Sequence, residues 1–218
     1  MDKTKRVIFI DLDGTILNND RRWYRLHLDL AKSYRFQPIN RTTYLQAKKN
    51  NINERIIIQK TNIVPHKINA YIKKRINLLE IQKYLLFDKV KPGMRGFLKK
   101  FANNYQLILV TKRNKPRNCL SQLNQTHLLP YFSKVIITKQ DEKDRTVRKY
   151  LSQKQIQDSV FVGDTEDDYQ TARKLKINCL LVTYGARNKN FIQKIKPPYI
   201  ADTVEELTCA LKTVFNLD

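Results

Sequence analysis

The chain has 218 residues, 41% of them hydrophobic, and a formal net charge of +22 at pH 7. This length and composition favour a soluble globular protein with one large or two small domains. No apolar run is long enough to span a membrane. The three cysteines form no CxxC pair, which argues against a zinc site or a disulfide framework. Because the N-terminus leads directly into an apolar run, we expect no signal peptide and a cytoplasmic protein.

The first predicted element is a buried strand over residues 7–10, which is followed by Asp11-Leu12-Asp13-Gly14-Thr15. The run Val-Ile-Phe-Ile is β-branched and aromatic, and the Gly-Thr pair supplies a turn signal. Residues two apart in a strand share a face. Asp11 and Asp13 are therefore expected to project together at the carboxyl end of the strand, where open parallel sheets bind their ligands.

A helical pattern follows from about residue 18 to residue 90. Apolar residues recur at spacings of three and four over 23–34 and over the long stretch 67–87, and Pro38 and Pro65 interrupt the segment. These stripes predict the core of a small helical bundle. The segment also contains 16 Lys and Arg against 5 Asp and Glu, so its positive charge is about twice as dense as elsewhere.

From Pro92-Gly93 onward, predicted strands alternate with predicted helices. The helices are expected at 94–104, 116–125, 144–153, 166–176 and 203–215, and the strands at 106–111, 134–138, 159–162 and 179–182. This alternation predicts an α/β fold with a Rossmann-like parallel sheet covered on both faces. The catalytic core would comprise residues 1–17 and 91–218, and residues 18–90 would form an inserted α-helical cap domain over the carboxyl edge of the sheet.

Polar side chains also follow three later strands. Thr111 ends one strand, Lys139 and Lys143 follow the next, and Asp164 and Asp168 follow the strand at 159–162. Parallel strands end at one edge, so we expect these groups to converge. Carboxylate ligands favour Mg²⁺ over zinc. With a lysine and a hydroxyl to offset phosphoryl charge, the set suits phosphoryl transfer, in which one aspartate attacks phosphorus and another moves the proton.

The motifs Asp11-Leu12-Asp13-Gly14-Thr15, Thr111, a lysine, and Gly163-Asp164-x-x-x-Asp168 together resemble the haloacid dehalogenase-like (HAD) superfamily. Within it, the chain resembles the branch with a helical cap that includes phosphoglycolate phosphatase-like enzymes. The resemblance implies a role for each position: Asp11 as nucleophile and metal ligand, Asp13 as general acid/base and metal ligand through its backbone carbonyl, Thr111 and the lysine as phosphate-binding groups, and Asp164 and Asp168 as Mg²⁺ ligands, the latter directly or through water.

The chain departs from the family pattern at two places. A small polar residue usually follows the motif threonine, but here Lys112-Arg113 follows it; either could reach a second anionic group, although a solvated position is favoured. The motif lysine usually precedes proline, and neither candidate does. Lys143 is preferred to Lys139 because it lies just before the run at 144–153. Candidate substrate contacts are Lys112 and Arg22, and the basic residues expected near the mouth of the site are Arg21, Arg22, Lys48 and Lys49.

The leading hypothesis is a Mg²⁺-dependent phosphomonoesterase that hydrolyses a small anionic phosphorylated metabolite through an aspartyl-phosphate. A dehalogenase is disfavoured because Asp13 is present. A sugar-phosphate mutase shares the same chemistry and stays open. The basic cap suggests another class, a nucleic-acid-associated protein or a polynucleotide end phosphatase. No recognisable binding motif supports nucleic acid, and abundant Lys, Asn and Ile also suit an AT-rich genome. No membrane partner is expected, and the oligomeric state is left open.

Overall fold

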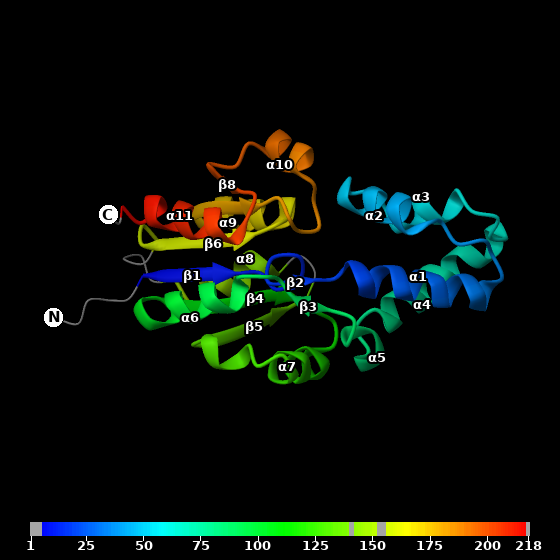
Figure 1. Ribbon diagram of the computed structural model, residues 1–218, viewed down its shortest axis with the longest axis horizontal. Coiled ribbons are helices and arrows are strands. Elements are labelled where there is room, and N and C mark those ends of the chain that lie inside the picture. The colour runs from blue at the N-terminus through cyan, green and yellow to red at the C-terminus, as the bar shows by residue number, and fades with distance from the viewer. Residues whose placement is uncertain (1–5, 140–141, 152–155, 217–218) are drawn as a thin grey trace.

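The computed structural model describes residues 6–139, 142–151 and 156–216. Within them lies a six-stranded sheet in the order β5-β4-β1-β6-β7-β8, and all five strand pairings are parallel (Figure 1). Its strands are β1 (Val7–Ile10), β4 (Gln106–Lys112), β5 (Lys134–Thr138), β6 (Ser159–Gly163), β7 (Asn178–Val182) and β8 (Tyr199–Ala201). The predicted α/β class with a parallel sheet is confirmed.

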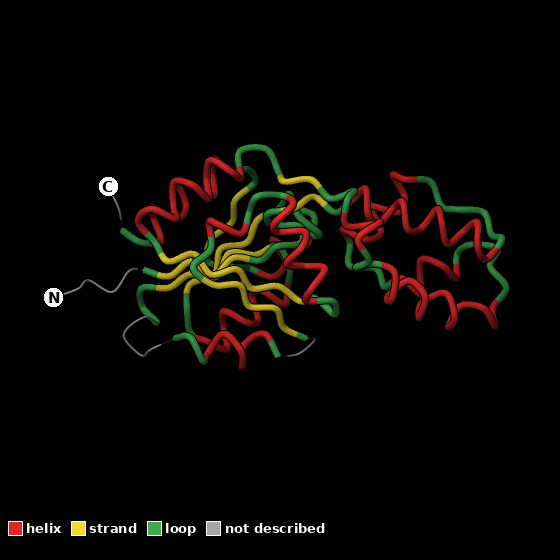
Figure 2. Tube along the Cα trace, turned by 90° about the horizontal axis from the view of Figure 1, so that it is seen from below, coloured by secondary structure: helices red, strands yellow, loops and turns green. Residues whose placement is uncertain are grey.

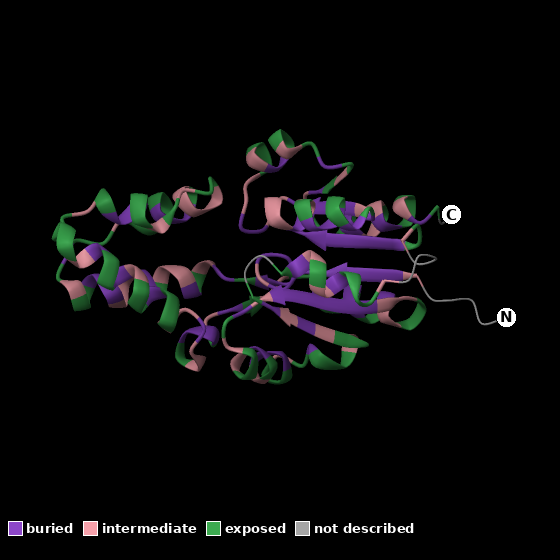
Figure 3. Ribbon diagram, turned by 180° about the vertical axis from the view of Figure 1, so that it is seen from behind, coloured by how far each residue is buried: buried purple, intermediate pink, exposed green. Residues whose placement is uncertain are grey.

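Helices cover both faces of this sheet, which is why its central strands are apolar on both sides. Side chains such as Ile8 and Ile10 pack in one cluster with α6 (Met94–Asn104), α7 (Pro116–Gln125) and α11 (Val204–Val214). Val7 and Phe9 pack on the other face with α8 (Lys143–Arg148), α9 (Glu166–Leu175) and α10 (Lys189–Ile195). Figure 3 shows the resulting buried strands between more exposed helices. Because successive side chains of β1 point to opposite faces of the sheet, this strand contributes apolar residues to the clusters on both faces.

A separate helical lobe extends beyond the carboxyl edge of the sheet (Figure 2). It contains α1 (Asp20–Tyr34), α2 (Arg41–Lys49), α3 (Glu54–Gln59), the 3₁₀ turn η1 (Pro65–Lys67), α4 (Ile68–Leu78) and α5 (Gln82–Leu85). One apolar cluster joins α1, α4 and α5, and a smaller one joins α1, α2 and α3. The predicted apolar stripes therefore form the interior of a small bundle.

Two short strands connect this lobe to the sheet. β2 (Leu17–Asn18) pairs antiparallel with β3 (Lys89–Val90), so the outgoing and returning chains run side by side. The division into a core of residues 1–17 and 91–218 and a cap of residues 18–90 stays a prediction, and these strands lie at its two boundaries. Below, the term cap refers to residues 18–90.

Several element predictions need correction. The long helical stretch at 67–87 is broken, because α4 ends at Leu78 and α5 begins at Gln82. The helix expected at 144–153 ends at Arg148, and residues 152 and 153 lie outside the described residues. β8 and α10 were not predicted, since a three-residue strand and a seven-residue helix carry weak periodicity. Within the described residues, no helix has the length and apolar character needed to cross a membrane.

Candidate active site

The carboxyl ends of β1, β4 and β6 bring the predicted motif residues to one place. Asp11 directly follows β1, Thr111 is the penultimate residue of β4, and Asp164 directly follows β6. Because β1 lies between β4 and β6 in the sheet, these three positions are neighbours at its edge. Asp11, Thr111 and Asp164 are all buried, with exposures of 7% or less. The sequence argument for a crevice at this edge therefore holds in the structure.

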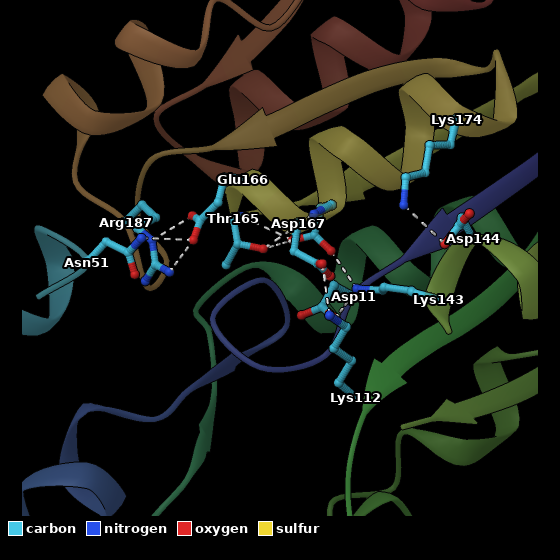
Figure 4. Close-up of polar contacts among 11 residues, drawn as sticks. Asp11, Asn51, Lys112, Lys143, Asp144, Thr165, Glu166, Asp167, Lys174 and Arg187 are labelled. Carbon is cyan, nitrogen blue, oxygen red and sulfur yellow. Dashed lines mark hydrogen bonds and ion pairs between the residues drawn. The ribbon is translucent and has the colours of Figure 1, made fainter. Parts of the chain in front are cut away.

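The ammonium group of Lys143 lies between the carboxylates of Asp11 and Asp168, and Figure 4 shows this side chain pointing toward Asp11. Its Nζ lies 2.9 Å from Asp11 Oδ1 and 2.5 Å from Asp168 Oδ1. Burial alone would lower the pKa of Lys143, but the two carboxylates outweigh it and raise that pKa, so the ammonium stays charged. Lys139, the alternative considered from the sequence, is exposed. The position of Lys143 supports the preference for this lysine.

Asp164 and Asp168 are held by the structure around them. Asp164 accepts a hydrogen bond from Thr15 Oγ1 at 2.9 Å and another from the Ala186 amide at 2.5 Å. Asp168 Oδ2 accepts from the amides of Asp164 and Thr165 and from Thr165 Oγ1. Thr165 Oγ1 in turn accepts from the Asp168 amide, and this contact and the one from the Thr165 amide form a capping box at the start of α9. These contacts hold both oxygens of Asp164 and one oxygen of Asp168, whose other oxygen, Oδ1, faces Lys143.

The three buried carboxylates fit a divalent cation. Asp11, Asp164 and Asp168 each offer an oxygen within 4.8 Å of the others. Burial raises the pKa of Asp164 to about 7, with repulsion from Asp168 as the next cause. Burial also raises the pKa of Asp11 well above its usual value, despite the opposing charge of Lys143. This clustered negative charge is what Mg²⁺ would neutralise, and the all-oxygen donor set is one that Mg²⁺ prefers.

Asp13 faces two arginines. Its carboxylate lies 2.8 Å from Arg22 Nη2, and Arg113 contacts both of its oxygens, at 2.7 and 2.5 Å. Burial raises the pKa of Asp13, but the charges of Arg113 and then Arg22 outweigh it and lower that pKa. Arg22 also lies 3.3 Å from the buried Asp88. The expectation that Arg113 is a solvated charge is therefore wrong, and Arg22 is buried as well, since both side chains are only 2% exposed.

A crevice of about 580 Å³ separates this edge of the sheet from the cap. Asp11, Asp13, Thr111, Lys112 and Lys143 line it. Arg22, the other predicted substrate contact, is not among the described residues that line it. Of the basic residues expected at the mouth, Lys48 lines the crevice, whereas Lys49 lies 3.8 Å from Asp20.

The three acidic residues Glu166, Asp167 and Asp168, which follow β6, each have a different basic partner. Asp168 is buried against Lys143, whereas the Asp167 side chain is 42% exposed and accepts from Lys112 Nζ at 2.8 Å. Glu166 accepts two hydrogen bonds from Arg187, from Nε and Nη2 at 2.8 Å each, and a third from Asn51 Nδ2 at 3.0 Å. This contact joins the cap to the core (Figure 4). Of these three neighbouring acids, Asp168 is therefore the one that is buried beside Lys143.

Sequence reasoning missed three groups that shape the site. The Ala186 amide and Thr15 fix Asp164, and Arg187 fixes Glu166. Gly185 indicates the close approach of the Ala186 amide to Asp164, since a Cβ at position 185 would lie 2.3 Å from Asp164 Cβ. Arg187 lies in a loop without periodicity, so its contact with Glu166 depends on the tertiary structure alone.

Comparisons with known proteins agree with this geometry. Residues 7–182 match the family model described as haloacid dehalogenase-like hydrolase. A curated phosphoglycolate phosphatase from Colwellia psychrerythraea is 22% identical over 230 residues, with 95% of this chain and 97% of the relative covered.

Solved structures share the fold. A haloacid dehalogenase-like hydrolase from Streptococcus pneumoniae gives a TM-score of 0.77 at 16% identity, covering 95% of this chain and 98% of that one. The magnesium-bound HAD hydrolase YfnB from Bacillus subtilis gives 0.65 at 18% identity, covering 99% and 100%. Since the family model spans most of the sequence and the motif residues meet at one edge of the sheet, the chain belongs to the haloacid dehalogenase-like hydrolases.

Proposed function

We propose that this protein is a Mg²⁺-dependent phosphomonoesterase that hydrolyses a small phosphorylated metabolite through an aspartyl-phosphate. The observation that carries the proposal is the meeting of Asp11, Asp164 and Asp168 with the Lys143 ammonium at the end of the crevice. The similarity to a protein named phosphoglycolate phosphatase also supports phosphate ester hydrolysis. Asp11, Asp164 and Asp168 would hold the ion, with the backbone carbonyl of Asp13, and the ion would offset phosphoryl charge.

In the first step, a carboxylate oxygen of Asp11 attacks phosphorus and the ester oxygen leaves. Asp13 donates a proton to that oxygen, so the product alcohol departs neutral. In the second step, water attacks the phosphorus of the aspartyl-phosphate, Asp13 takes a proton from this water, and Asp11 is released as a carboxylate. Thr111 and Lys143 donate hydrogen bonds to the phosphoryl oxygens throughout.

The ion pairs of Asp13 with Arg22 and Arg113 oppose the protonation of Asp13 that the first step needs. Asp13 must hold a proton when the ester bond breaks, and these arginines lower its pKa. We therefore propose that Asp13 leaves this ion pair when substrate is bound. Arg22 belongs to α1 of the cap, so movement of the cap would change the surroundings of Asp13. Cap closure would also exclude bulk water from the phosphoryl group.

The test is phosphate release from a panel of phosphomonoesters, with Mg²⁺ and with a chelator. Asp11→Asn should abolish release, because an amide is a poor nucleophile, and its circular dichroism spectrum should match that of the wild type. Release that survives Asp11→Asn or complete removal of the metal would contradict the proposal. Transfer of phosphate within a sugar bisphosphate, without release to water, would instead identify a mutase.

A further inference from the structure

Beyond the reacting carboxylates, the crevice has an apolar wall supplied by the cap. The apolar side chains that line it are Trp23, Ile52, Ile72, Ile76 and Leu79. Ile72, Ile76 and Leu79 are spaced by four and three residues, so they form one stripe along α4 and the residue that caps it, Leu79. Ile76 is 55% exposed despite its size. Grouped apolar side chains that remain in contact with water commonly mark a ligand-binding surface.

The apolar wall comes from two different parts of the cap. Trp23 and Ile52 pack with the small cluster of Tyr44, Leu45 and Ile57. Ile72 and Leu79 pack with the larger cluster of α1, α4 and α5. The crevice therefore adjoins two apolar surfaces, each with a rigid interior behind it. A flat, partly apolar body would cover these surfaces, whereas a two-carbon acid would leave most of them in water.

A polar cluster also faces the crevice from the cap. Glu54 accepts hydrogen bonds from Tyr44 and Tyr71, and its carboxylate lies 2.9 Å from Arg75 Nε and 3.2 Å from Lys48 Nζ. The Arg75 side chain is only 7% exposed, and its Nη1 has no hydrogen-bond partner within the described residues. A buried donor of this kind favours a ligand that brings an acceptor to it.

The charges around the crevice do not favour a second anionic group. Away from Lys143, each cation among the described lining residues has a carboxylate partner: Lys48 and Arg75 with Glu54, Lys112 with Asp167, and Arg187 with Glu166. A carboxylate on the leaving group would have to displace one of these partners. A neutral group that accepts hydrogen bonds would not.

We infer that the crevice selects phosphomonoesters whose leaving group carries a neutral heteroaromatic ring, the chemistry of a nucleoside monophosphate. The ring face would cover the apolar wall, and an acceptor on its edge would approach Arg75. The volume of about 580 Å³ suits a ligand of this size. The inference rests on the proposed phosphatase activity and names the substrate class of the same site.

Trp23 is the only tryptophan of the chain and lines the crevice, so its fluorescence reports binding there. Asp11→Asn protein with Mg²⁺ would be titrated with adenosine monophosphate, uridine monophosphate and 2-phosphoglycolate, with excitation where the nucleotides do not absorb. We expect saturable quenching by a nucleotide at concentrations at least about tenfold below those needed for 2-phosphoglycolate. The inference would be overturned if both nucleotides quenched the fluorescence only at concentrations equal to or above those needed for 2-phosphoglycolate.

Kinetics of surface variants provide the second test. Ile76→Ala should raise KM for the preferred nucleoside monophosphate up to about tenfold, because apolar contact with the ring is lost. KM for 2-phosphoglycolate should change little. Ile56→Ala is the matched control, since Ile56 is 48% exposed on α3 but does not line the crevice.

The outcomes separate the two proposals. Hydrolysis of 2-phosphoglycolate in preference to every nucleotide, unchanged by Ile76→Ala, would overturn the ring inference and leave the phosphatase standing. If no ester is hydrolysed, the phosphatase proposal fails, and the fluorescence titration still decides whether the crevice binds a heteroaromatic ring.

Discussion

At the scale of single residues, Lys143 shows how a buried charge depends on its partners. Its side chain is 4% exposed and contacts Asp11 and Asp168. An ion pair in such surroundings offsets desolvation only while both members are present. Removal of the ammonium would leave three buried carboxylates, including Asp164, to repel one another.

We therefore expect Lys143→Met to lower the free energy of unfolding by about 3–5 kcal/mol in metal-free buffer. Urea denaturation followed by circular dichroism would measure this loss. Mg²⁺ should recover part of it by neutralising the carboxylates. Lys139→Met is the control, because Lys139 is exposed. Equal stability of the two variants would contradict the role assigned to this ion pair.

Gly163 shows a second local constraint, the close approach of a side chain to the backbone. A Cβ at Gly163 would lie 2.3 Å from Asp168 Cγ, so the carboxylate could not stay where it caps α9. We expect Gly163→Ala to destabilise the fold by about 1–3 kcal/mol through this overlap. Gly96→Ala should instead stabilise it by about 0.5–1 kcal/mol, since Gly96 lies in α6 with open space around it. Thermal unfolding of both variants tests the contrast.

At the scale of elements, His27 ties α1 to the chain that follows it. Its Nε2 accepts a hydrogen bond from the Ile39 amide at 3.1 Å, and the whole side chain is buried. Protonation would place a second hydrogen against that amide. The pKa of His27 is lowered to about 4: burial is the largest cause, Glu54 opposes it, and the charge of Arg75 acts in the same direction as burial.

Because the folded pKa lies below the unfolded value of 6.5, the unfolded chain binds the proton more readily. Stability is therefore complete above about pH 6.5 and falls as the pH drops from there to about 4, by up to about 3 kcal/mol. Urea unfolding at a series of pH values should show a shallower dependence in His27→Gln than in the wild type. His66→Gln, which alters an exposed histidine, should keep the wild-type slope.

At the scale of the whole molecule, the net charge of +22 is the dominant property. The crevice does not account for it, since its described cations are paired with carboxylates. Most of the excess must therefore lie outside the crevice, where its charges repel one another through solvent. Binding to nucleic acid stays a prediction; its affinity would fall steeply with added salt.

Screening of this repulsion should stabilise the fold. We expect the midpoint of thermal unfolding to rise by roughly 2–8 °C between low salt and about 0.5 M sodium chloride, equivalent to about 1–2 kcal/mol. Sucrose at matched osmolarity separates screening from general solute exclusion. A midpoint that falls with salt would show that specific ion pairs, such as those of Arg187 and Arg75, outweigh the repulsion.

The sequence predicts the α/β class, the strands at whose carboxyl ends Asp11, Thr111 and Asp164 lie, and the helical nature of residues 18–90. These follow from local periodicity and from the rule that parallel strands end at one edge. It could not place Arg113 on Asp13, Arg187 on Glu166, or the apolar stripe of α4 along the crevice. Such contacts join residues that are far apart in the chain. The neighbouring positions of β1 and β4 and of β6 and β7 in the sheet bring Arg113 to Asp13 and Arg187 to Glu166, whereas the packing of the cap against the sheet edge places the apolar stripe along the crevice.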